Sequence, residues 1–392
     1  MRLIEDVLAP WLDQMREAAG GFDLFDAHTH IGRNDPDGFR QTPDELLAGL
    51  GRCDARALVF PMHEPDGYGD ANDEAIAAAA GSDERLVAFC RVQPRDGAAA
   101  VAEARRALDA GARGIKLHPR AEGFTMGLAT VRELVALAHE RQVPVLIHAG
   151  RGIPALGEDT VHLGAEFHDA KLILAHAAIS DLAWLCHELP RVPNVYVDTS
   201  WWNPVDLVAL FTLAPPGQVL YASDSPYGSP TVGAVQTLRC ARQAGLTDEQ
   251  VRGVAGGQLA RIMAGETPLD LGPPPGRAIA IDPLLERIVS HLGTVISRAF
   301  VRADFTEVLG LARLACAVGD EADCAPVAAT VLELLDLFER HLAPPEDGRP
   351  FPVAARFLVA AIFVARTPDV PLGPLPEPPP HPVRSAAEQG PP

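Results

Sequence analysis

Short apolar runs alternate with Ala- and Leu-rich segments of helical periodicity up to Met263. The runs that we interpret as strands are Leu24–His30, Ala57–Pro61, Leu86–Val92, Gly114–His118, Val143–His148, Lys171–His176, Val195–Thr199 and Val219–Asp224. Such alternation predicts an α/β fold with a parallel sheet, and eight units is the number that closes a (βα)8 TIM barrel. A doubly wound open sheet is the alternative. It is disfavoured because polar residues end many strands instead of gathering at one switch point.

The pattern changes at both ends of the barrel region. Residues 1–20 are apolar-periodic and predict a leading helix, so the barrel is expected over residues 21–263. Residues 264–282 contain a Pro-Pro-Pro-Gly run, which is typical of a linker. Residues 283–366 have helical periodicity without a strand signal and predict an all-helical domain. The proline-rich residues 367–392 are expected to form a disordered tail.

Composition narrows the class of partner. The chain has 392 residues, 47% of them hydrophobic, and a formal net charge of -19. This charge argues against nucleic acid and against an anionic membrane surface, and no apolar run is long enough to span a bilayer. The six cysteines show no CxxC spacing and are expected to be reduced packing residues. The acidic N-terminus does not resemble a signal peptide, so we expect a cytoplasmic protein that acts on a small molecule.

The most informative motif is Asp26-Ala27-His28-Thr29-His30 at the end of the first strand. Residues two apart on a strand point to the same face, so His28 and His30 should face one way. Neutral imidazole is the commonest nitrogen ligand of divalent metals, which makes a metal the best explanation for two buried imidazoles. Hydrogen-bonded core or surface histidines are the alternative for this motif alone.

Other polar residues end later strands. They are Lys116 and His118, then His148, His176 and Asp224. In a βα barrel the carboxyl ends of all strands meet at one rim, so these residues should converge. Burying so many polar groups without partners would cost about 1–3 kcal/mol each, and a metal with its water would supply those partners.

This pattern resembles the amidohydrolase superfamily, specifically its amidohydrolase-related branch, which also includes aminocarboxymuconate-semialdehyde decarboxylase-type enzymes. The resemblance extends from residue 21 to about 263 and excludes the helical domain. It rests on combined segments, none of which is specific alone. They are Asp26–Gly32, Gly114–Pro119, Ile147–Gly150, Leu174–Ala177, Val195–Ser200 and Ala222–Tyr227.

The resemblance implies a role for each matching residue. His28, His30, His148 and Asp224 would be metal ligands, and Asp224 would also take a proton from the water that the metal activates. His176 would bind a second metal or touch the water and substrate. The expected metal is zinc, and manganese would also fit a mixed nitrogen and oxygen site.

Lys116 has two interpretations. Only Lys116 and Lys171 are lysines among 33 basic residues, so Lys116 is a residue that arginine does not replace. In some branches of the family a lysine at this strand is carbamylated and bridges two metals, a chemistry that arginine cannot perform. The alternative is a cation that pairs with Asp26 or with a substrate carboxylate.

Residues in the loops after the strands should determine specificity. The candidates for substrate binding are Tyr68, His118, Arg151, Trp201 and Trp202. Arg151 would clamp a carboxylate, or it is a surface arginine. Trp201 and Trp202 would form an aromatic wall, or they cap the barrel.

The favoured function is a metal-dependent hydrolase that acts on the carbonyl of an amide, a lactone or a related small molecule. The second hypothesis is a non-oxidative decarboxylase of an aromatic or unsaturated carboxylic acid, which would use the same ligands. The third is a non-catalytic barrel that serves as an interaction module. The helical domain has three candidate roles: it forms a homo-oligomer, covers the barrel mouth or binds another protein.

Overall fold

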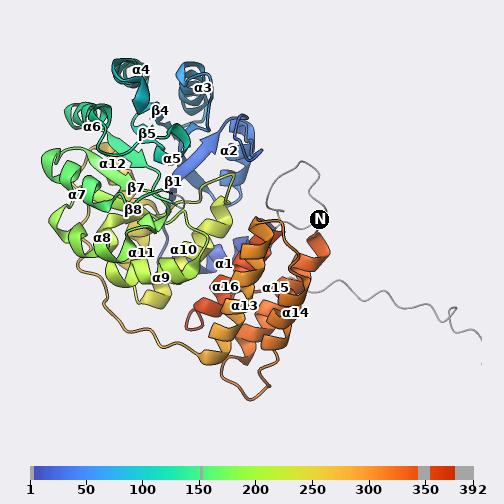
Figure 1. The fold of residues 1–392 in the computed structure, drawn as a ribbon. Coiled ribbons are helices and arrows are strands. Elements are labelled where there is room, and N and C mark those ends of the chain that lie inside the picture. Colours follow the sequence, from blue (N-terminus) through green and yellow to red (C-terminus); the bar gives the residue numbers. More distant parts are fainter. Residues whose placement is uncertain (1–3, 151–152, 343–353, 376–392) are drawn as a thin grey trace, which may run out of the picture.

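The computed structural model describes residues 4–150, 153–342 and 354–375 of the chain (Figure 1). Its strands all run parallel, in two sheets ordered β1-β2-β3 and β4-β5-β6-β7-β8-β9. The strands are β1 (Leu24–Ile31), β2 (Ala55–Pro61), β3 (Leu86–Ala88), β4 (Cys90–Arg91), β5 (Ile115–Leu117), β6 (Pro144–Ile147), β7 (Lys171–Leu174), β8 (Val195–Asp198) and β9 (Val219–Leu220). This arrangement confirms the predicted α/β barrel.

Backbone hydrogen bonds join the two sheets into a closed ring. Phe89 N–H donates to Val59 O at 2.9 Å on one side, and Ala27 N–H donates to Tyr221 O at 2.9 Å on the other. Closure leaves no open sheet edge and directs every strand's carboxyl end toward one mouth.

The third predicted strand, Leu86–Val92, differs from the expectation because it is divided into β3 and β4. Its first part pairs with β2 and its second part with β5, and Phe89 lies between them. The Phe89 ring fills the barrel interior beside Gly114, where an added Cβ would lie 2.5 Å from the ring. The change of partner strand at this bulky residue explains the interruption.

Helices surround the barrel, as the apolar periodicity predicts. They are α2 (Pro43–Gly51), α3 (Gly69–Ala80), α4 (Ala98–Asp109), α5 (Pro119–Glu122), α6 (Ala129–Arg141), α7 (Gly157–Glu166), α8 (Leu182–Glu188), α9 (Pro204–Leu213), α10 (Pro230–Ala244), α11 (Asp248–Arg252) and α12 (Gln258–Ala264). Local sequence sets several of their starts. For example, Thr42 and Glu45 form a reciprocal capping box at α2, with Pro43 at the first helical position.

The C-terminal helical domain consists of α13 (Pro283–Phe300), α14 (Thr306–Ala315), α15 (Ala325–His341) and α16 (Ala355–Arg366). These helices form a bundle beside the barrel and next to the leading helix α1 (Ile4–Ala18), as Figure 1 shows. α16 contacts α10 and α9, and α1 contacts α10. The domain therefore packs directly on the barrel although a linker separates the two in sequence.

The segment after α16 differs from the expectation that disorder begins at Thr367. Thr367 is fully buried, and the Arg239 guanidinium donates to Thr367 O at 2.9 Å and to Pro371 O at 2.7 Å. Trp11 Nε1 donates to Pro374 O at 2.8 Å. Prolines lack the amide that regular elements need, but their carbonyls still accept, which is how this segment is held. The rest of the expected tail, residues 376–392, lies outside the described residues.

Two smaller expectations concern cysteines and membrane spans. All six cysteines are free and buried. Over the described ranges, no helix combines the length and the apolar character that crossing a membrane requires.

Candidate metal centre

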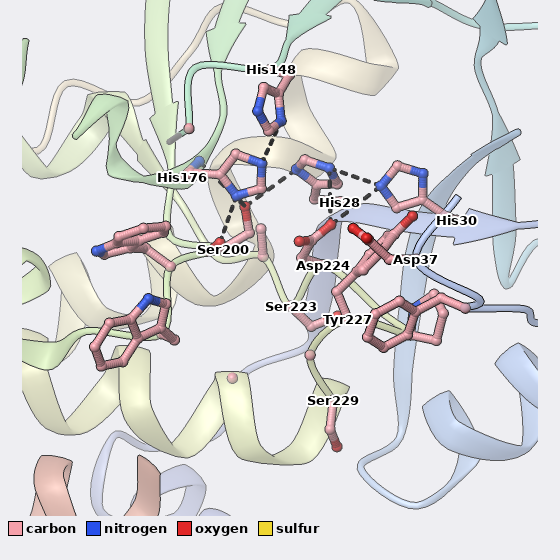
Figure 2. A pocket seen from close by; sticks show the side chains of 18 of the residues that line it. His28, His30, Asp37, His148, His176, Ser200, Ser223, Asp224, Tyr227 and Ser229 are labelled. Carbon is pink, nitrogen blue, oxygen red and sulfur yellow. Dashed lines mark hydrogen bonds and ion pairs between the residues drawn. The ribbon is translucent and has the colours of Figure 1, made fainter. Parts of the chain in front are cut away.

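The histidines and the aspartate that end the strands converge at the barrel mouth (Figure 2). His28 and His30 lie near the end of β1, and Asp224 follows β9. His148 follows β6 and His176 follows β7. The parallel arrangement thus gathers residues separated by almost two hundred positions, as the sequence analysis predicted.

Three candidate ligand atoms form a compact triangle, which we call the triad: His28 Nε2, His30 Nε2 and Asp224 Oδ1. The two imidazole nitrogens are 3.1 Å apart. Asp224 Oδ1 lies 3.3 Å from His28 Nε2 and 3.2 Å from His30 Nε2. Two atoms bound to one zinc at about 2.1 Å in tetrahedral geometry are roughly 3.4 Å apart, so the triangle has the size of a metal site.

Asp198, for which no role was predicted from the sequence, orients His28 from behind. Its Oδ2 accepts from His28 Nδ1 at 2.8 Å, and both side chains are almost fully buried. A proton held on Nδ1 leaves the lone pair of Nε2 free to face the other two atoms of the triad. A carboxylate that accepts from the second ring nitrogen is the usual partner of a metal-binding histidine. The available signal was the position of Asp198 as the last residue of its strand.

A second pair of imidazoles lies next to the triad. His176 Nε2 is 2.9 Å from His148 Nδ1, and His176 Nδ1 donates to Ser200 O at 2.7 Å. His148 stacks on His118 with ring centroids 3.8 Å apart. A Cβ at Gly150 would come within 2.8 Å of His176 and 3.0 Å of His148, so only glycine fits between them.

Backbone strain accompanies the site. Asp224 has φ 57°, and His176, Ala177 and Ala178 follow one another at φ 59°, 56° and 46°. Non-glycine residues adopt this left-handed region rarely and at a cost of about 1–3 kcal/mol, and such residues cluster where function requires an unusual geometry. The strain lies at two of the strand ends that supply candidate ligands.

Burial shifts the pKa values of the clustered imidazoles and of Asp224 in the direction that favours their neutral forms. It lowers the pKa of His28, His30, His118, His148 and His176, and it raises the pKa of Asp224. Burial, followed by the charge of Arg91, lowers the pKa of Lys116 to about 7. Neutral imidazole is the form that binds metal, and a divalent cation would favour the ionised Asp224.

These residues fit a divalent metal. His28, His176 and Asp224 each offer a nitrogen or oxygen atom within 4.8 Å of the other two. His176 therefore lies close enough to the triad to share a metal with His28 and Asp224. His148 Nε2 is buried and has no hydrogen-bond partner among the described residues. Nitrogen and carboxylate oxygen together form a donor set that suits zinc or manganese.

Lys116 is buried beside the triad, with its Nζ 3.2 Å from His28 Nε2 and 4.6 Å from the centroid of the Phe60 ring. Asp26 does not take the pairing role that we considered for it. Its carboxylate instead accepts from the backbone amides of His28 at 3.1 Å and Ser223 at 2.9 Å. Asp26 therefore ties β1 to the loop that carries Asp224.

The specificity candidates have different positions. His118, Trp201 and Trp202 line a cavity of about 720 Å³ that opens from the metal centre. Tyr68 is not among the described residues that line it, because its hydroxyl donates to Glu122 at 2.6 Å behind the cavity wall. That wall contains Arg91, which pairs with Glu122 at 2.6 Å and which the sequence analysis missed. Arg151 lies outside the described residues.

Fold and site together define a TIM-barrel protein with a candidate metal site at the barrel mouth. A family model described as amidohydrolase matches residues 25–257, which is more than half of the chain. The chain therefore belongs to the amidohydrolase family, and the resemblance seen in the sequence is confirmed. The matched region ends before α13, so the helical domain lies outside it.

Solved structures support the barrel fold at low sequence identity. An uncharacterized TIM-barrel protein from Bordetella bronchiseptica matches with a TM-score of 0.51 and 13% identity, covering 62% of this chain and 99% of its own. A candidate amidohydrolase from Staphylococcus aureus gives 0.50 and 14%, covering 62% and 100%. IDCase from Metarhizium anisopliae gives 0.50 and 13%, covering 64% and 99%. No curated protein matches the chain significantly.

Proposed function

We propose that this protein is a metal-dependent hydrolase that adds water to the carbonyl of an amide, a lactone or a related small molecule. The observation that carries the proposal is the triad, whose three ligand atoms lie 3.1–3.3 Å apart at the mouth of a closed barrel. A cavity of about 720 Å³ adjoins it and is of the size that holds a small organic ligand.

His28, His30 and Asp224 would hold the metal, with His148 or His176 as a further ligand. The bound cation would polarise the substrate carbonyl and lower the pKa of water, and zinc is the metal that we favour. Asp198 keeps the His28 proton on Nδ1, and Ser200 O does the same for His176. Asp224 accepts the proton of the attacking water and passes it to the leaving group.

Lys116 is proposed as a candidate ligand in carbamylated form. The amine is buried next to His28, where its lowered pKa favours the neutral form that reacts with carbon dioxide. The alternative is a cation that remains beside the metal. Mass spectrometry of the native protein separates the two, because a carbamate adds the mass of one carbon dioxide molecule.

Decarboxylation of an aromatic or unsaturated acid is the second candidate. Its support is Arg120, which lines the same cavity, since guanidinium groups bind carboxylates well. Arg91 also lines the cavity, but its guanidinium already donates to Glu122 and to Pro61 O. Product analysis distinguishes the reactions: release of carbon dioxide or bicarbonate from an aromatic acid would replace the hydrolase proposal.

The test combines metal analysis with a substrate screen. We expect the purified protein to contain zinc or manganese, to hydrolyse members of a panel of lactones and amides, and to lose that activity with a chelator and regain it with the metal. His30→Ala should abolish metal retention. His168→Ala is the matched control, because His168 is 75% exposed and lies away from the mouth. Protein that neither contains nor binds either metal would refute the proposal.

A further inference from the structure

The cavity at the barrel mouth continues onto the helical domain. Its lining includes Ile296 and Phe300 from α13, and Arg356 and Val359 from α16. These residues lie beyond the region that matches the amidohydrolase family, which ends at residue 257. A wall of the cavity is therefore built by a part of the chain that this family match does not include.

The helical domain is fixed to the loop that carries Asp224. Arg356 Nη2 donates to Gly228 O at 2.8 Å and to Pro226 O at 3.2 Å, and its Nη1 pairs with Glu5 at 2.8 Å. Both carbonyls lie within four residues of Asp224. A Cβ at Gly228 would lie 2.0 Å from Ser223 O, so this loop has little freedom. The position of α16 is thus coupled to that of the metal centre.

Aromatic rings connect the metal centre to the helical domain. The Trp201 ring lies 6.5 Å from His176, Trp202 lies 5.9 Å from Trp201, and Phe300 lies 6.2 Å from Trp202, all between ring centroids. Ile296, Val359 and Val232 are further apolar residues that line the cavity. We call this set the apolar wall: Trp201, Trp202, Val232, Ile296, Phe300 and Val359.

We infer that the substrate carries an apolar extension, such as an alkyl chain or an aromatic ring, that lies against the apolar wall while its carbonyl end is at the triad. This inference rests on the proposed metal-dependent function and names the class of substrate. A small polar substrate would leave the wall in contact with water, whereas burying an apolar extension there is favourable by about 25 cal/mol per Å². The helical domain then acts as a specificity element of the enzyme.

Alkyl hydroxamates test the inference without needing the true substrate. The hydroxamate group binds zinc, and the alkyl chain probes the wall. Calorimetry on the metal-loaded protein should show affinity rising by about 100-fold or more from acetohydroxamate to octanohydroxamate. The reason is that each buried methylene contributes about 0.8 kcal/mol, which raises affinity up to about fourfold. Phe300→Ala should reduce this ratio about tenfold.

Val301→Ala is the matched control, because Val301 is the next residue and is 73% exposed. It should leave the ratio unchanged. Val359→Trp, which would fill the cavity from α16, should weaken binding of octanohydroxamate more than that of acetohydroxamate. Val359→Trp adds side-chain atoms and creates no void, so it tests contact between the alkyl chain and the apolar wall independently of Phe300→Ala.

The outcomes distinguish a failure of the apolar-wall inference from a failure of the proposed metal-dependent function. If acetohydroxamate binds but the affinity does not depend on chain length, or if Phe300→Ala and Val301→Ala behave alike, the apolar-wall inference is wrong and the metal site stands. If the protein holds no metal and no hydroxamate binds, the proposed function fails, and the inference fails with it.

Discussion

The barrel mouth and the helical domain are built on opposite principles. The mouth buries imidazoles, carboxylates and a lysine close together, and it holds residues such as His176 and Asp224 in left-handed backbone geometry. The core of the helical domain buries apolar side chains, such as Leu292 and Leu334, and ion pairs such as Arg313 with Asp336 lie near its surface. The barrel mouth contains buried polar groups and strained backbone, whereas the helical domain packs apolar helix faces against one another.

This difference indicates where each region acts. Buried polar groups and strained residues are costly and persist where a ligand or a reaction requires them. An apolar core contributes stability and shape. We therefore expect the helical domain to affect activity through the wall that it adds to the cavity, and the candidate metal centre to affect activity through its imidazoles and carboxylate. Substitutions in the two regions should have separable effects.

The largest expected effect is the loss of turnover when a residue of the triad is replaced. His28→Ala or Asp224→Ala should reduce activity by at least about 10³-fold, because a metal supplies several kcal/mol of transition-state stabilisation. The fold should remain largely intact, as circular dichroism and thermal melting would show. Full activity in either variant would refute the assignment of the metal centre.

The next effect concerns the stability of the helical domain. Leu334 is fully buried in α15, so Leu334→Ala should lower the free energy of unfolding by about 2–5 kcal/mol. Chemical denaturation measures this, with Leu314→Ala as the control because Leu314 is 65% exposed. Metal content should not change. Loss of metal from Leu334→Ala would show that the two regions are not separable.

A smaller effect is expected from the group behind the metal ligand. Asp198→Asn keeps the size of the side chain but removes the charge that holds the His28 proton on Nδ1. Metal affinity should fall about 10- to 100-fold, as competition with a chelator would measure. An unchanged affinity would mean that Asp198 only holds the local backbone, through its hydrogen bonds from the amides of His176 and Ser200.

The smallest effect belongs to the surface of the helical domain. Arg313 pairs with Asp336 and, at 3.5 Å, with Glu339, and the three side chains are 33%, 50% and 46% exposed. Arg313→Ala should change the free energy of unfolding by less than about 1 kcal/mol, and the change should shrink further in high salt. A loss comparable to that of Leu334→Ala would contradict the distinction between surface and core.

Periodicity in the sequence predicted most of the fold. The alternation of apolar runs and helices specified the barrel because each pattern must bury a face of a given period. It failed at Phe89, where one apolar run changes its partner strand, and at residues 367–375. There, proline-rich composition suggested disorder, but Arg239 and Trp11 supply hydrogen bonds that no local pattern reveals.

The residue types at the strand ends determined by themselves that His28, His30, His148, His176 and Asp224 would meet, because parallel strands of a barrel share one rim. Only the tertiary structure decided which groups support them. It brought Asp198 behind His28, moved Tyr68 out of the cavity to Glu122, and set Phe300 opposite Trp202. Contacts of this kind join distant positions, and they depend on side-chain packing in three dimensions, which a linear pattern does not encode.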